Sequence, residues 1–483
     1  MPESEDLKLA NSQCRLFSIL EEFFRMISGK GIGAVPSLES FRDWIHENAQ
    51  KFAARGAEAF PWVYEELTKF YEECRQQGFY GQSKQLGGIK LVLGGTNRFT
   101  GSHLDSVRKM LMYADTILIP DPVLPWVETP RKEERFRDVL FWEQVFILLH
   151  LKPLIDAEFT YPAIVVFPSW EKSLEAQDPQ TREGQLSLVT AVLGDSLGHS
   201  FQNYRELVDF SHQHSTEFLQ GVDKNRLLIG PGGDLGEPLN VSIQRYKDDI
   251  KTWRSTEYQN LAEKSPDSLV ALLALTERIG PLYHLFENAE ELVANPMFSL
   301  PVHWHYYSLC TQFFQHRLEK LSLLDARSVA EIRSLGAQQL RWLGDIPIEA
   351  IVELRKRGEN EQFRKHLRQY TERLHEATLQ DLNQVAAEVS RGIASVLIEH
   401  QNEIRRIQEK YDRKAIHTAL IAGVTGAALL FPALALLLGG AAVLAPTGKF
   451  TWDTISRTLE KRQTSRSLMG VLAEAKKKHE RVS

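Results

Sequence analysis

A stretch of 34 residues near the C-terminus, 415–448, contains no Asp, Glu, Lys or Arg, although these four residue types make up 25% of the chain. A transmembrane helix needs about 20 apolar residues in succession, so the stretch is long enough to cross a bilayer. The alternative is a helical hairpin buried in a soluble protein, because alanine and glycine dilute the hydrophobicity of the stretch. We expect membrane association, since buried helices rarely need so long an uncharged run.

The uncharged stretch can be accommodated in a membrane in two ways. A single helix from Ala415 to Leu438 would be about 36 Å long and would hold Pro432 as a kink. A hairpin would instead turn at Pro432, with a second arm of about 20 Å that ends near Leu444. Five basic residues lie in 405–414 and five in 449–466. Equal basic flanks favour a hairpin with both ends in the cytoplasm. The residues expected in the membrane include Ala415, Leu420, Leu430, Pro432, Leu438 and Leu444.

A long amphipathic helix is predicted immediately before the uncharged stretch. Apolar residues recur every three or four positions from Leu382 to Tyr411, with charged and amide side chains between them. This helix could pack against other helices of the same chain, or it could mediate self-association through residues 382–411 as a coiled coil. The tail that follows the uncharged stretch, 449–483, has nine basic and four acidic residues, so it could lie on anionic lipid.

Three short apolar runs predict β-strands in the first half of the chain. They are "IKLVLGG" at 89–95, "DTILIPDP" at 115–122 and "YPAIVVFPS" at 161–169, and helical patterns separate them. A strand, a helix and a second strand in this order predict a βαβ unit with parallel strands. A fourth run, "LLIGPGG" at 227–233, is compatible with either a strand or a buried loop.

These patterns predict an α/β plus α-helical fold of several domains, as expected for 483 residues. A small parallel-sheet domain would be followed by a helical middle and by the long amphipathic helix that leads to the apolar hairpin or transmembrane segment. The predicted regions are an N-terminal helical region at 1–85, an α/β domain at 86–180, a mainly helical region at 181–345, the long helix at 346–414, the membrane segment at 415–448 and the basic tail at 449–483.

One loop of the predicted βαβ unit is a candidate phosphate site. The loop after the first strand and the start of the next helix face the crevice where parallel-sheet proteins bind anions. The candidate residues are Gly94, Gly95, Thr96, Arg98, Thr100, Ser102 and Asp121. The glycines would let the backbone approach a phosphate, Arg98 would supply a charge-assisted hydrogen bond, and Asp121 would follow the next strand. The loop matches neither GxGxxG nor a P-loop, and an ordinary glycine-rich turn is the alternative.

Two other motifs do not support chemistry. "GDSLGHS" at 194–200 is similar to the serine motif of GDSL hydrolases, but Asp209 and His212 follow Ser196 much too closely for their Asp/His pair, and the preceding residues have helical spacing. The histidine pairs at 212/214 and 303/305 have a spacing that diverges on a helix, and a third metal ligand is not evident. The sequence therefore predicts no metal site, and it identifies neither catalytic residues nor a cofactor.

Charge and cysteine content narrow the compartment and the partners. With 57 basic and 63 acidic residues the net charge is −6, which argues against nucleic acid as a partner. The three cysteines are isolated, and the N-terminus is acidic where a secretory signal would be basic, so a cytoplasmic location is expected for the bulk of the chain. Two functions remain open. One is a membrane-associated sensor or effector, for example in bacterial defence or stress, and the other is a soluble enzyme or binding protein for a phosphorylated ligand.

Overall fold

The computed structural model describes residues 5–35, 38–76, 79–94, 101–111, 114–128, 135–168, 179–253, 256–298, 301–320 and 348–356, together with the single positions 361, 365 and 369. This part of the chain is mostly helical and contains a small four-stranded parallel sheet. The prediction of an α/β plus α-helical fold is confirmed in this coarse form. The predicted long helix at 382–411, the uncharged stretch at 415–448 and the tail at 449–483 lie outside the described residues.

The sheet has the strand order β3-β2-β1-β4, and all its neighbouring strands are parallel. Its strands are β1 (Lys90–Gly94), β2 (Thr116–Pro120), β3 (Ile164–Phe167) and β4 (Asn295–Phe298). In the register of the sheet, Leu91 lies between Ile117 of β2 and Asn295 of β4. Nearly every strand residue is buried, because helices cover both faces, and this explains why the strands are uninterrupted apolar runs.

The strand β4 was not predicted from the sequence. Its sequence is only "NPMF". Proline has no backbone N–H group to donate to a neighbouring strand, so it is rare in central strands. Pro296 is tolerated because β4 lies at the edge of the sheet, where it pairs with β1 alone. The fourth apolar run, at 227–233, forms no strand, and its residues Leu227 to Gly230 make a buried loop.

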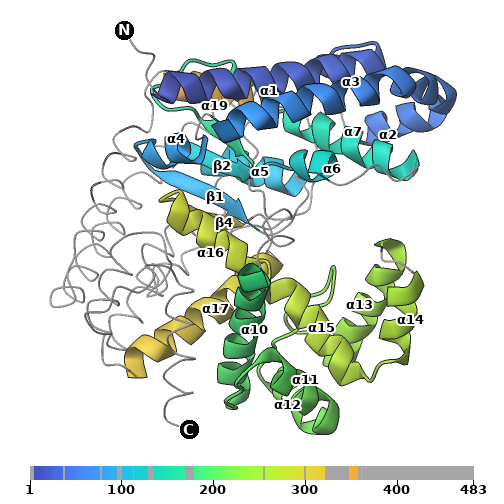
Figure 1. The fold of residues 1–483 in the computed structure, drawn as a ribbon, viewed down its shortest axis with the longest axis vertical. Helices are drawn as coiled ribbons and strands as arrows, with labels where there is room; N and C mark the ends of the chain where they lie inside the picture. The colour runs from blue at the N-terminus through green and yellow to red at the C-terminus, as the bar shows by residue number, and fades with distance from the viewer. Residues whose placement is uncertain are drawn as a thin grey trace.

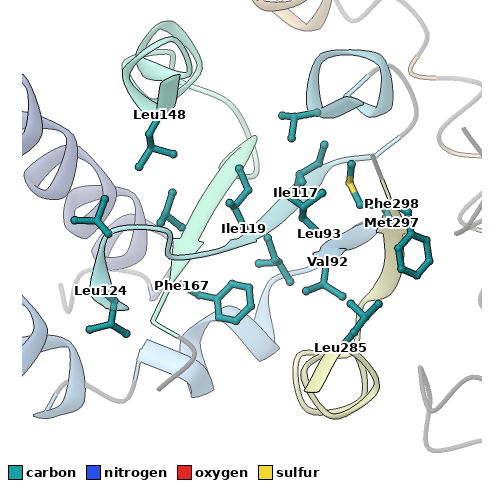
Figure 2. Packing of buried hydrophobic residues seen from close by; sticks show 14 of the residues in the cluster. Val92, Leu93, Ile117, Ile119, Leu124, Leu148, Phe167, Leu285, Met297 and Phe298 are labelled. Atoms are coloured by element: carbon teal, nitrogen blue, oxygen red, sulfur yellow. The ribbon is translucent and has the colours of Figure 1, made fainter. Parts of the chain in front are cut away.

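Helices cover both faces of the sheet and one of its edges (Figure 1). The helices α5 (Gly101–Met110) and α7 (Arg135–Leu149) lie on one face and α16 (Leu282–Glu291) on the other. The helix α1 (Glu5–Ser28) runs along the free edge of β3, where Gln13 hydrogen-bonds the backbone of Val166, and α3 (Ala49–Gln76) packs against α1. Figure 2 shows Leu148 of α7 and Leu285 of α16 on opposite sides of the strands. The sheet is therefore the middle layer of an α/β/α sandwich.

The remaining helices form the flanks of this sandwich and a second cluster. Those beside the sheet are η1 (Ile32–Ala34), α2 (Leu38–Glu47), α4 (Phe79–Gln85), α6 (Leu124–Glu128), α8 (Lys152–Ile155) and α19 (Ile348–Lys356). The second cluster, inserted between β3 and β4, contains α10 (Pro179–Leu197), α11 (Tyr204–Gln213), α12 (Ser215–Lys224), α13 (Leu239–Trp253), α14 (Thr256–Lys264) and α15 (Asp267–Ile279). The helix α17 (Pro301–Lys320) follows β4 and packs against α10 and α15 (Figure 1).

At the amino-terminal ends of the strands, which we call the amino-terminal edge of the sheet, polar side chains form hydrogen bonds with backbone groups. The Asp115 carboxylate accepts a hydrogen bond of 2.8 Å from the backbone N–H of Ile89. Arg355 of α19 donates to the carbonyl oxygens of Leu111, Ala114 and Asp115 at 3.2, 2.8 and 2.8 Å. Its guanidinium also lies 5.0 Å from the centre of the Phe159 ring. These contacts join α19, the last described helix, to the carboxyl end of α5.

One helical stretch in the described part of the chain, Asp267–Ala289, is long and apolar enough to cross a membrane by length and composition. It contains α15 and most of α16, and 67% of its most apolar window is buried inside the protein, which is typical of a core helix. It is therefore weak evidence for a membrane segment.

Candidate functional site

The sheet has a topological switch point between β1 and β4. From β1 the chain continues through α5 to β2 on one side, whereas β4 lies on the other side of β1 and leads into α17. Figure 1 shows α5 close to α6 and α7, and α17 on the other side of β1, beyond α16. In open parallel sheets a crevice forms where two such connections diverge at the carboxyl ends of the strands, and ligands bind there. The predicted phosphate loop, 94–102, follows β1 at this point.

The structure describes only part of the predicted loop. Gly94 is the last residue of β1, and a Cβ atom added there would lie 2.5 Å from Cδ2 of Leu285. The absence of a side chain at Gly94 therefore allows α16 to pack closely on β1. Ser102 is the second residue of α5, but its side chain is not described. The other predicted loop residues, Gly95, Thr96, Arg98 and Thr100, lie outside the described residues.

Asp121 follows β2 directly, as predicted, but its carboxylate is occupied by other parts of the protein. It accepts hydrogen bonds from the Tyr71 hydroxyl at 2.6 Å and from the backbone N–H groups of Val123 and Leu124 at 2.8 and 3.2 Å. Burial raises the pKa of Asp121 to about 6, and these hydrogen bonds oppose the shift. The structure thus gives Asp121 a structural role, in which it joins α3 to the start of α6.

Two buried histidines lie at the starts of the helices that leave the switch point. His103 is the third residue of α5 and is 1% exposed, and His303 is the third residue of α17 and is 7% exposed. Burial lowers the pKa of His103 to about 3, and the proximity of His303 adds to this effect. Burial also lowers the pKa of His303 to about 4, with a further contribution from Arg278. Both imidazoles are therefore neutral near pH 7.

The region around His303 has positive charge and an unused hydrogen-bonding atom. Arg278 lies half-buried in the last turn of α15, close enough for its charge to act on His303. Within the described residues, no carboxylate forms an ion pair with Arg278, and Nδ1 of His303 has no hydrogen-bond partner. An unpaired buried polar atom is costly unless a ligand or water satisfies it.

The arrangement suits the binding of an anion better than catalysis. Helix N-termini present free N–H groups and a positive dipole end, and Arg278 adds a full positive charge. In the described part of the chain, no group of three His, Cys, Asp or Glu side chains is placed to hold a metal ion.

The structure places the residues of the hydrolase-like motif on two helices. Ser196 lies inside α10, and its hydroxyl donates a 2.8 Å hydrogen bond to the carbonyl oxygen of Val192 one turn earlier. Asp209 and His212 lie on the separate helix α11, where both are exposed. Ser196 lies in the last turn of a helix and not on the sharp turn between a strand and a helix that exposes a nucleophile.

Sequence reasoning missed the three side chains that distinguish this site. His103 lies one residue beyond the predicted loop, so its position at the start of a helix after a strand could have drawn attention to it. His303 was considered only as one of a pair with His305. Nothing in the sequence around Arg278 indicates that it lies near His303, because helix packing brings the two together.

Comparisons of the chain with family models, curated proteins and solved structures give no match. The interpretation of the site therefore depends on the geometry of the switch point and on the groups around it.

Proposed function

We propose that the protein binds a phosphorylated small molecule at the switch point between β1 and β4, and that it associates with a membrane through residues 415–448. A sensor or effector would combine the two properties. The observation that carries the first part is that α5 follows β1 and α17 follows the neighbouring strand β4. His103, His303 and Arg278 lie near the starts of these two helices.

A phosphate group fits this crevice for electrostatic reasons. The first N–H groups of a helix have no partner within the helix, and together with the helix dipole they favour an anion. Arg98, in the loop between β1 and α5, adds a charged donor within the same connection. The neutral imidazoles can donate N–H hydrogen bonds to a phosphate oxygen. A nucleotide or a sugar phosphate is the expected class of ligand.

The sensor part of the proposal is supported by the contacts of α5. Its N-terminus lies at the switch point, and the carbonyl groups of Leu111 and Ala114, just beyond its C-terminus, accept hydrogen bonds from Arg355 of α19. The chain continues from α19 towards the predicted long helix and the uncharged stretch. A single helix therefore contacts both the proposed ligand site and the start of the C-terminal region, which offers a short route for coupling them.

Ligand binding is tested by thermal unfolding of the full chain with a panel of nucleotides and sugar phosphates. A ligand present at 100 times its Kd should stabilise the folded state by about 2.7 kcal/mol. Arg98→Ala should weaken binding roughly 10- to 100-fold, since a charge-assisted hydrogen bond contributes about 1.5–3 kcal/mol. The stabilisation should therefore largely disappear in this variant at the same ligand concentration.

Arg25→Ala is the matched control, because Arg25 is an exposed arginine in the last turn of α1 whose ion pairs, among the described residues, are with Glu21 and Glu22 of its own helix. It should leave the stabilisation unchanged. If no compound in the panel shifts the unfolding of the wild-type protein, or if both variants respond equally, the ligand-binding proposal is wrong.

Membrane association is tested by fractionation of cells that produce the full chain or a variant without residues 415–448. We expect the full chain in the membrane fraction, from which detergent but not high salt should release it, and the deletion variant in the supernatant. If the full chain stays in the supernatant without detergent while the deletion variant precipitates, the stretch is part of a soluble core and this part of the proposal fails.

A further inference from the structure

We infer that a cavity between α1, α3 and α4 binds a small organic carboxylate with an apolar body. The cavity has a volume of about 480 Å³. This value lies within the range of roughly 300–1,000 Å³ that is usual for small-molecule sites. None of the three helices carries His103, His303 or Arg278, so the inference is independent of the proposed phosphate site.

Each of the two long helices borders the cavity with one of its faces. Lys8 and Arg15 of α1 both line it and are about two helical turns apart, so their side chains project from the same face at a spacing of about 10.5 Å along the helix. Phe70 and Cys74 of α3 are about one turn apart and also share a face. Gln82 of α4 completes the wall, and Figure 1 shows α4 beside the start of α1 and the end of α3.

The cavity has an apolar floor and a charged rim. Phe70 and Cys74 are each only 3% exposed, and burial raises the pKa of the Cys74 thiol to about 12, so that it is uncharged near pH 7. Lys8 and Arg15 are exposed, and Glu73 is half-exposed. A ring or an aliphatic chain can pack on the floor, while a polar group of the same ligand reaches the rim.

The charges at the rim determine which polar group fits. The guanidinium of Arg15 donates a hydrogen bond to the carboxylate of Glu73, so these two charges compensate each other. The ammonium group of Lys8 forms no ion pair within the described part of the chain, and a carboxylate of the ligand can pair with it. A phosphate monoester carries close to two negative charges near pH 7, and Glu73 would repel the second. A group with a single negative charge therefore fits best.

The experiment is a calorimetric titration of the full chain with three probes of equal size, namely phenylpropionate, phenylpropanamide and phenylpropylamine, at matched ionic strength. The wild-type protein should bind the carboxylate about fivefold more tightly than the amide, as expected for a partly exposed ion pair, and the amine most weakly. Lys8→Met keeps most of the apolar stem but removes the charge. It should abolish the difference between carboxylate and amide and leave the affinity for the amide unchanged.

Two further variants locate the binding site. Ser12 of α1 is half-buried and lines the cavity, so the ring of Ser12→Phe would occupy the space of the ligand and should weaken all three probes at least about tenfold. Lys51→Met is the matched control for the loss of a charge, because Lys51 is an exposed lysine in the first turn of α3 that does not line the cavity. It should bind all probes like the wild type. Circular dichroism establishes that each variant is folded.

Several outcomes would overturn the inference. It is wrong if the carboxylate does not bind at millimolar concentration, if carboxylate and amide bind equally, or if Lys8→Met and Lys51→Met behave alike. Unchanged binding by Ser12→Phe would place the probes elsewhere and reject the cavity as their site. If phenylethyl phosphate binds more than about tenfold more tightly than phenylpropionate, the ligand class is wrong. None of these results involves Arg98 or the switch point, so each leaves the proposed function to its own test.

Discussion

The two edges of the parallel sheet differ in how their buried polar groups are used. At the amino-terminal edge, the side chains of Asp115 and Arg355 are hydrogen-bonded to backbone groups of neighbouring segments. At the carboxyl-terminal edge, the neutral imidazole of His303 is buried with an unsatisfied nitrogen, and Arg278 beside it has no ion-pair partner among the described residues. The first arrangement stabilises the fold, whereas the second costs stability.

This difference indicates where function is to be expected. Buried polar groups without partners are costly, and proteins retain them mainly where a ligand or a reaction needs them. Parallel sheets place ligands at the carboxyl ends of their strands, and the unsatisfied Nδ1 of His303 lies at the start of the helix that follows β4. Substitutions at the amino-terminal edge should therefore reduce stability, and substitutions at the carboxyl-terminal edge should reduce binding.

The largest expected effect is that of Asp115→Ala at the amino-terminal edge. The substitution removes the acceptor for the buried N–H of Ile89, and we expect the free energy of unfolding to fall by about 3 kcal/mol. Asp115→Asn, which keeps one oxygen acceptor, should cost roughly 1 kcal/mol. Denaturant unfolding measures both. If the two variants are as stable as the wild type, the comparison of the two edges loses its basis.

Acid should destabilise the protein through the carboxyl-terminal edge. His303 has a folded pKa of about 4, below the usual value of 6.5, so the unfolded state binds more protons between these values and stability falls as the pH falls. From pH 6.5 to 4.5, the wild-type protein should lose about 2 kcal/mol more than His303→Gln. Asp121, whose raised pKa of about 6 acts in the opposite direction, is present in both proteins and cancels. Parallel stability curves of the two proteins would contradict this expectation.

Arg355→Met should have an intermediate effect on stability. It keeps much of the apolar stem that packs near Phe159 but removes three hydrogen bonds to backbone carbonyl groups, and we expect a loss of about 1.5 kcal/mol. Hydrogen exchange should become faster at the end of α5 and in α19. Unchanged exchange in both helices would mean that Arg355 does not hold α19 on the body of the protein.

The smallest effect on stability is expected for His303→Leu at pH 7.5. Leucine has a similar size and no unsatisfied nitrogen, so the free energy of unfolding should change by less than about 0.5 kcal/mol, or even rise. Thermal and denaturant unfolding provide the measurement. A loss above about 2 kcal/mol would show that His303 stabilises the fold, and the distinction between the two edges would then disappear.

Much of the fold could be predicted from local patterns. The uninterrupted apolar runs around Leu91, Ile117 and Val165 indicated buried parallel strands, and the helices between them followed from their spacing. The strand β4 was not predicted, because a segment of four residues that includes a proline has only a weak local preference for the strand conformation. It becomes a strand through its pairing with β1, which lies about 200 residues earlier in the chain.

The candidate site was predictable only in its location. A glycine-containing loop between a strand and a helix directed attention to the end of β1, where the structure has its switch point. Asp121 follows the expected strand, but its carboxylate binds Tyr71 of α3, a contact that no local pattern specifies. The proximity of Arg278 and His303 likewise arises from the packing of two helices.

The sequence by itself indicated three of the four strands and the helices between them, and it contains one uncharged stretch of 34 residues at 415–448. These properties depend on the local periodicity and polarity of the chain. Only the tertiary structure decided that β4 lies beside β1, that the carboxylates of Asp115 and Asp121 are hydrogen-bonded, and that Nδ1 of the buried His303 is not. The physical reason is that strand pairing and hydrogen bonding between distant segments depend on the whole packed core, and short stretches of sequence do not contain that information.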